Sequence, residues 1–97
     1  MKVSEITNKD IGEYLRIDDL DIKEEATIEA IKRAAIAYIK EYTSCTEEEL
    51  NEYEDVYIVV YILCQDMYDN RTLYVEGKEL NRTVETILNM HRKSLIG

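Results

Sequence analysis

The sequence predicts a mainly α-helical fold, a small helical bundle, and three observations support this expectation. The 97-residue chain contains no proline and only three glycines, so few residues interrupt regular structure. Three segments begin with a threonine or aspartate followed three residues later by an acid, a pattern typical of helix N-termini. Apolar residues after these starts recur at spacings of three and four, as on one face of a helix. A chain of this length forms a single domain, residues 1–97.

The predicted helix starts divide the N-terminal two-thirds of the chain. The capping pairs are Thr7 with Asp10, Asp21 with Glu24, and Thr46 with Glu49. Acids in each first turn also favour the positive end of the helix dipole. We expect the helix after Asp21 to run to about Tyr42, with one apolar face. A second row of this helix contains only alanine (Ala26, Ala30, Ala34 and Ala37). This row either admits a closely packed helix or reflects the helix propensity of alanine.

The segment "EDVYIVVYILCQDMYDN" is compatible with two structures. Its β-branched residues suit a buried strand. However, Val56, Val60, Leu63 and Met67 keep helical spacing, and a lone central strand would have no partner. We therefore predict a central helix, apolar nearly all round, that ends near Asn70. This helix completes a helical body over residues 1–70.

The remaining residues form two predicted elements. In "TLYVEGKEL", Leu73 and Val75 alternate with polar residues before Gly77, so residues 71–81 are expected to form a glycine-centred β-hairpin or extended arm. Residues 82–97 are then expected to form a C-terminal docking helix after a cap at Asn81. Its apolar stripe comprises Val84, Ile87, Leu88, His91 and Leu95. Two arrangements stay open: the helix packs against its own core, or it docks on another molecule.

Charge is distributed unevenly along the chain. Residues 1–70 hold 18 acidic and 7 basic side chains, a net charge of −11, whereas residues 71–97 hold 3 acidic and 5 basic ones, a net charge of +2. The acidic body argues against a phosphate-binding protein, because affinity for nucleic acid rests on lysine and arginine. The basic residues are either ordinary solvated charges or contacts to an acidic surface. The candidate partner-binding or oligomer-binding residues are Arg71, Lys78, Arg82, Val84, Ile87, Leu88, His91, Arg92 and Leu95.

Eight tyrosines stand in a chain without phenylalanine or tryptophan. Tyrosine joins an apolar ring to a polar tip, so it suits positions shared between a core and an interface. Core filling is the alternative explanation.

The search for catalytic and metal-binding patterns predicts neither an enzyme nor a cofactor. The only histidine, His91, has no cysteine or acid at a ligand or relay spacing, so a packed or interface position is expected. Cys45 and Cys64 lack zinc-site spacing, and two free thiols suit a reducing cytosol. The chain has no phosphate-binding glycine loop and no EF-hand pattern. We expect no signal peptide, because "MKVSEITNKD" lacks an apolar stretch. We expect no membrane contact, because the longest apolar run, "VYIVVYILC", is far too short to span a bilayer.

The chain resembles the small helical head–tail connector (adaptor) proteins of long-tailed bacteriophages and prophages over nearly its whole length. The resemblance rests on "SEITNKDIGEYLRIDD", on "AAIAYIKEYTSCTEEELNEY", and on "VYILCQDMYDNRTLYVEGKELNRTVETILNMHR". No single stretch is a catalytic signature, so the order and spacing of all three carry the resemblance.

The resemblance implies a virion protein without enzymatic activity or cofactor. Its subunits would form a dodecameric ring beneath the portal protein, made in the host cytoplasm and located at the head–tail junction. The ring would join the portal to a stopper or tail-completion protein and extend the channel, with DNA only as passing cargo. An acidic channel wall would let the duplex slide rather than hold it.

The alternative from another class is an acidic helical regulator or DNA mimic that covers a basic partner. The −11 body favours it. Self-association and portal binding distinguish the two hypotheses.

Overall fold

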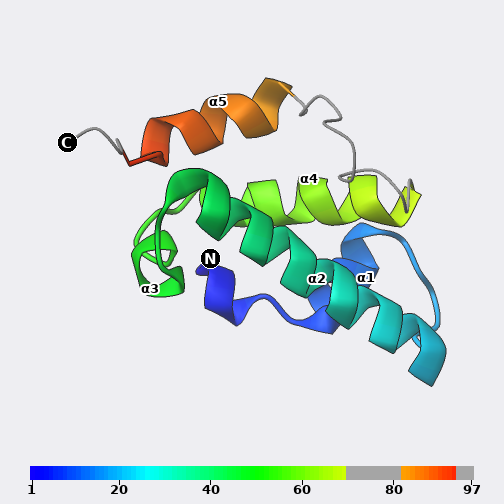
Figure 1. Ribbon diagram of the computed structural model, residues 1–97. Coiled ribbons are helices and arrows are strands. Elements are labelled where there is room, and N and C mark those ends of the chain that lie inside the picture. The colour runs from blue at the N-terminus through cyan, green and yellow to red at the C-terminus, as the bar shows by residue number, and fades with distance from the viewer. Residues whose placement is uncertain (70–81, 94–97) are drawn as a thin grey trace.

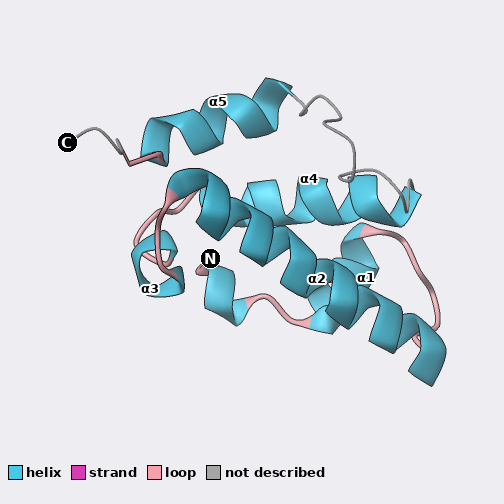
Figure 2. Cartoon of the chain, viewed as in Figure 1, coloured by secondary structure: helices cyan, strands magenta, loops and turns pink. Residues whose placement is uncertain are grey.

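The computed structural model describes residues 1–69 and 82–93, and within these ranges the chain is mainly helical without strands. The elements are the 3-10 helix η1 (Val3–Glu5) and the α-helices α1 (Asn8–Tyr14), α2 (Ile22–Thr43), α3 (Glu47–Leu50), α4 (Val56–Asp69) and α5 (Arg82–His91). Figure 2 shows these helices joined by loops. The predicted mainly α fold is therefore confirmed. The predicted hairpin or arm at 71–81 lies outside the described residues.

Helices α2 and α4 make the most extensive contact in the bundle. Helices η1 and α1 pack on one side of α4, and α5 runs along the other side (Figure 1). The centre of the bundle is α4, as the sequence predicted. The segment is a helix and not a strand, as predicted, and it packs its apolar surface against several neighbouring helices. Its buried residues are Val56, Val59, Val60, Leu63 and Cys64.

The predicted helix caps are present at all three starts. Thr7 and Thr46 form reciprocal capping boxes with Asp10 and Glu49, respectively. The Asp21 carboxylate accepts a hydrogen bond from the Glu24 amide at 2.7 Å. The expected return contact from the Glu24 side chain is not formed. Instead, the Glu24 carboxylate accepts a bond from the Tyr68 hydroxyl at 3.3 Å, which ties the start of α2 to the end of α4.

A tight turn after α1 brings the following loop back onto the helix. Arg16 has φ of 62°, and the Ile17 amide donates to the Gly12 carbonyl at 3.0 Å, which satisfies a carbonyl at the helix end. Gly12 lies directly under the returning loop. A Cβ atom at this position would lie 3.1 Å from both methyl carbons of Leu20. The absence of a side chain therefore permits this close approach.

The other helices contribute one apolar face each to the same core. Buried residues of these helices include Ile11 from α1, Ile28, Ala35 and Ile39 from α2, Leu50 from α3, and Val84 and Leu88 from α5. The alanine row of α2 lies outside the core: Ala26, Ala30, Ala34 and Ala37 are all exposed. No helix of the described residues packs on that row.

Candidate functional site: the clasp at the end of helix α5

Helix α5 packs against α2 and α4 of its own chain. Val84 and Leu88 are fully buried, and Ile87 is half-buried. Of the two arrangements that the sequence left open, the structure therefore shows packing on the chain's own core. This corrects the expectation for Val84 and Leu88 as partner-binding residues, because in this position neither presents surface to another molecule.

The C-terminal end of α5 is joined to the body by a group of polar contacts, here called the C-terminal clasp. The body contributes Tyr42, Thr43, Cys45, Glu49, Tyr53 and Asp55, and the α5 end contributes Asn89, His91, Arg92 and Lys93. The body residues come from the end of α2, from α3 and from the loops on either side of α3. The clasp therefore joins four consecutive segments to the last described turn of the chain.

His91 is at the centre of the clasp. Its Nε2 lies 2.8 Å from Oδ1 of Asp55, and its ring stacks on Tyr53 with centroids 3.9 Å apart. The His91 side chain is 16% exposed and that of Asp55 is 37% exposed. The carboxylate and the tyrosine ring together fix the position of the imidazole. Of the packed and interface positions expected for His91, the structure shows packing within this chain, beside an acid that local spacing did not indicate. Its prediction as a partner-binding residue stays a prediction.

Backbone and thiol contacts close the clasp around the turn after α2. The Lys93 amide donates to the Thr43 carbonyl at 3.0 Å. The buried Cys45 thiol donates to the carbonyls of His91, at 3.6 Å, and Thr43, at 3.7 Å. Cys45 therefore contacts the backbone of His91 rather than its ring. The arrangement ties two chain segments together, and it is not a thiol–imidazole pair of the kind that activates a nucleophile.

Charged groups complete the clasp at its exposed rim. The Lys93 ammonium pairs with the Glu49 carboxylate, and this bond, followed by the Thr46 amide, holds the pKa of Glu49 below its ordinary value. The same bond raises the pKa of Lys93. The Tyr42 hydroxyl donates to Asn89 Oδ1 at 2.8 Å, and the Arg92 guanidinium lies 5.0 Å from the centre of the Tyr42 ring.

The residues predicted to bind a partner do not form one cluster in the structure. His91 and Arg92 belong to the clasp, whereas Arg82 is exposed at the opposite end of α5. Arg71, Lys78 and Leu95 lie outside the described residues. Sequence reasoning did not place Asp55, Tyr53 or Tyr42 in this site. His91 and Asp55 are 36 residues apart, so no local spacing could indicate their pairing.

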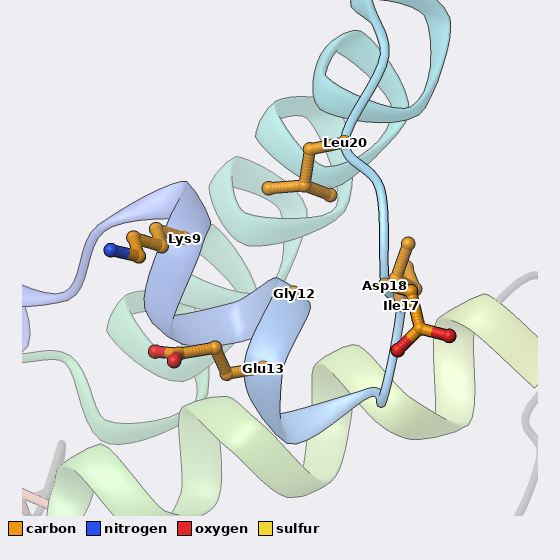
Figure 3. Close-up of a pocket in the computed structure, with 6 residues that line it drawn as sticks. All are labelled: Lys9, Gly12, Glu13, Ile17, Asp18 and Leu20. Carbon is orange, nitrogen blue, oxygen red and sulfur yellow. The ribbon is translucent and has the colours of Figure 1, made fainter.

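A cleft outside the clasp lies between α1 and the loop that follows it. This cleft has a volume of about 360 Å³ and is lined by Lys9, Gly12, Glu13, Ile17, Asp18 and Leu20 (Figure 3). Its lining combines the apolar side chains of Ile17 and Leu20 with charged side chains of both signs. Binding sites of this size usually hold a few convergent polar groups. In the described residues, the one buried side-chain atom without a hydrogen bond is Asn8 Oδ1, which does not line this cleft. The cleft therefore indicates no ligand class.

Residues 1–69 and 82–93 also lack the features of a metal site and of a membrane-spanning helix. These ranges contain no group of three or more histidine, cysteine or acidic residues able to hold a metal ion. None of the helices in these ranges has the length and hydropathy needed to cross a bilayer.

Comparison of the chain with protein-family models, with curated proteins and with solved structures finds no match. Any functional conclusion therefore rests on the residues and contacts described above.

Proposed function

We propose that this protein is a structural head–tail connector of a long-tailed bacteriophage or prophage. In this role, copies of the chain form a ring beneath the portal protein and join it to a stopper or tail-completion protein. The role requires no catalysis and no cofactor. The observation that carries the proposal is a C-terminal segment, residues 82–93, with a net basic charge and an amphipathic helix, which packs on an acidic helical body and is held there by the C-terminal clasp.

The order of the helices supports the proposal. A short capped helix, α1, precedes the long α2, the short capped α3 and the apolar α4, and α5 ends the described chain. This is the order of elements on which the resemblance to connector proteins depends. The agreement concerns arrangement rather than any single residue.

The charge distribution supports a role in assembly. Within 82–93, Arg82, Arg92 and Lys93 outnumber the single acid, Glu85, whereas the preceding body is strongly acidic. Complementary charge between such surfaces steers encounter and fixes register. Of these cations, Arg82 is exposed and makes no ion pair with a described residue, so it is available to an acidic neighbour.

The experiment is to mix the protein with the portal protein encoded in the same gene neighbourhood. Complexes are then analysed by size exclusion with light scattering and by negative-stain imaging. We expect a ring that caps the narrow end of the portal. A Kd of about 1 µM corresponds to a binding free energy of roughly −8 kcal/mol. Absence of binding at concentrations well above about 1 µM would contradict the proposal.

A charge variant and its matched control sharpen this test. Arg82→Glu should weaken ring or portal assembly, because it reverses the exposed charge at the start of α5. Lys23→Glu makes the same charge change in the first turn of α2, where an acid suits the helix dipole, and should assemble normally. Equal loss in both variants would mean that net charge, not α5, controls assembly.

The acidic body favours one other candidate, a regulator or DNA mimic that covers a basic partner. Such a protein would bind its partner as a monomer or dimer and would ignore the portal. The stoichiometry measured in the portal experiment separates this candidate from the connector.

A further inference from the structure

An exposed aromatic face lies on the side of the bundle formed by η1, α1 and α4. It comprises Met1, Tyr14, Tyr57, Ile58 and Tyr61, and is called the aromatic face below. Met1 is 51% exposed, Tyr14 is 46% exposed and Ile58 is 39% exposed, while Tyr57 and Tyr61 are half-buried. Large apolar side chains gathered on one surface are a mark of interaction sites.

The rings of the aromatic face form one continuous layer. Tyr14 and Tyr61 stack with centroids 4.9 Å apart, and Tyr57 meets Tyr61 edge-on at 6.0 Å. Ile58 is three residues from Tyr61 on the same helix, so the two side chains are neighbours. Among residues 1–69 and 82–93, the Tyr61 hydroxyl donates to the Met1 sulfur, at 3.7 Å, and thioether sulfur is a weak acceptor. The face therefore keeps both apolar area and hydrogen-bonding capacity.

Acidic side chains border this layer. Burial raises the pKa of Tyr61, and the next causes include the negative charges of Asp10 and Glu13 on α1. Neither acid forms an ion pair with a described residue, although Asp10 caps α1. A surface that fits here should combine an apolar contact with positive charge.

The outer face of α5 has this chemistry. Arg82, Thr86 and Met90 follow one another at intervals of four residues, and all three are exposed. Met90 is 68% exposed and is the most exposed apolar side chain of α5. Methionine packs favourably on aromatic rings, and arginine pairs with carboxylates.

The two complementary surfaces lie on different sides of the molecule. Helix α5 runs along one side of α4, and η1 and α1 lie on the other (Figure 1). One molecule therefore cannot join them to each other. A contact between different surfaces of identical subunits is head-to-tail, and such a contact generates a ring when its rotation closes.

We propose that the outer face of α5 in one copy packs on the aromatic face of a second copy, with Met90 against Tyr14 and Tyr61 and Arg82 beside Glu13. The inference rests on the proposed connector function and assigns the surfaces through which its subunits join. It makes α5 a helix with two contacts: its apolar stripe in its own core and its outer face on a neighbour.

The test uses sedimentation velocity of the full chain and of two variants that each remove one surface. Met90→Glu places an acid against the acidic border, and Tyr14→Ala removes the most exposed ring. Wild-type protein should associate with rising concentration up to about 1 mM, and each variant should weaken association at least about tenfold. Ile22→Glu is the matched control, because Ile22 is 89% exposed at the start of α2 and belongs to neither surface.

The mixture of the two variants is decisive. Each variant retains the surface that the other lacks, so a 1:1 mixture should form a heterodimer that does not grow further. Circular dichroism confirms that both variants are folded. The proposal is overturned if the wild type stays monomeric, if the mixture stays monomeric, or if Ile22→Glu weakens association equally.

The same variants separate this inference from the connector proposal. If both variants still form rings on the portal, the assigned surfaces are wrong and the connector function stands. If the wild type itself ignores the portal, the connector function is wrong whatever the sedimentation result.

Discussion

Helices α2 and α5 both pack on α4, but they are held there by different means. Helix α2 buries Ile28, Ala35 and Ile39 along its length, and a hydrogen bond from Tyr68 to Glu24 also joins it to α4. Helix α5 fully buries only Val84 and Leu88, and polar contacts concentrate at its C-terminal end. The first contact is mainly apolar along its length, whereas the second is a short apolar contact closed by a clasp.

This difference predicts two levels of stability within one small domain. Apolar burial scales with area, so the α2–α4 contact should persist until the whole domain unfolds. A helix fixed by two buried side chains and a clasp can detach locally at lower free energy. We therefore expect α5 to open while α2 and α4 remain packed.

The largest expected effect is from Leu63→Ala in α4. Leu63 is fully buried, so its truncation should lower the free energy of unfolding by about 2–5 kcal/mol. Urea denaturation followed by circular dichroism measures this loss, and all helices should unfold together at lower urea. A loss below about 1 kcal/mol would mean that α4 is not the centre of the core.

Leu88→Ala should produce a smaller and local effect. Its cost is limited by the free energy that attaches α5, because nothing more is lost once α5 has detached. We expect hydrogen exchange to accelerate in residues 82–93 while the amides of α2 and α4 stay protected. Glu85→Gln, at an exposed position of the same helix outside both its apolar stripe and its outer face, is the control and should leave exchange unchanged. Equal acceleration in α2 would remove the distinction between the two contacts.

Asp55→Asn should weaken the clasp by about 1 kcal/mol, because it removes the charge that the His91 imidazole contacts. Amide exchange and chemical shifts should change in residues 89–93 more than around Val84. The neighbouring Glu54→Gln is the matched control, since Glu54 is exposed and outside the clasp. Identical spectra for the two variants would show that the Asp55–His91 contact does not hold α5.

The smallest expected effect is the loss of the Glu49–Lys93 contact at low pH. The pKa of Glu49 is lowered from an ordinary value of 4.5, mainly by the Lys93 hydrogen bond, so its contribution is fully present above that pH. The contribution is lost as the pH falls through the lower, folded-state pKa. Acidification below about pH 4.5 should therefore loosen the α5 end, and Glu49→Gln should remove this part of the acid sensitivity.

Glu29 provides a comparison away from α5, at the contact of α1 with α2. Its pKa is lowered by Arg33 first and then by Asn8 of α1. Glu29→Gln should therefore alter the acid response of the α1–α2 contact and leave residues 89–93 unaffected. A pH titration of both variants by nuclear magnetic resonance distinguishes the two sites, and a matching response in both would contradict their independence.

Local patterns predicted much of the fold. The caps at Thr7, Asp21 and Thr46 depend on neighbours three residues away, so the sequence contains the whole signal. The central place of α4 followed from its apolar residues at helical spacing. The predicted return contact from Glu24 failed because Tyr68, distant in sequence, supplies a competing hydrogen bond.

The candidate site was only partly predictable, since its contacts join distant segments. An apolar stripe with Val84 and Leu88 requires a partner surface, but its periodicity does not identify that surface. The pairing of His91 with Asp55 and Tyr53 depends on how α5 meets the α3–α4 loop, which is a property of the packed bundle. Amphipathicity thus predicted that α5 packs, and the three-dimensional structure was needed to show where.

The two cysteines provide the most direct test of separate opening, because both are buried but in different regions. The Cys45 thiol contacts the His91 carbonyl in the clasp, whereas Cys64 lies inside α4, where burial raises its pKa to about 12. Cys64→Ala and Cys45→Ala each leave one thiol, whose modification rate is measured against urea concentration. We expect Cys45 to react at a lower opening free energy than Cys64. Equal opening free energies for the two thiols would show that α5 leaves its site only when the whole domain unfolds.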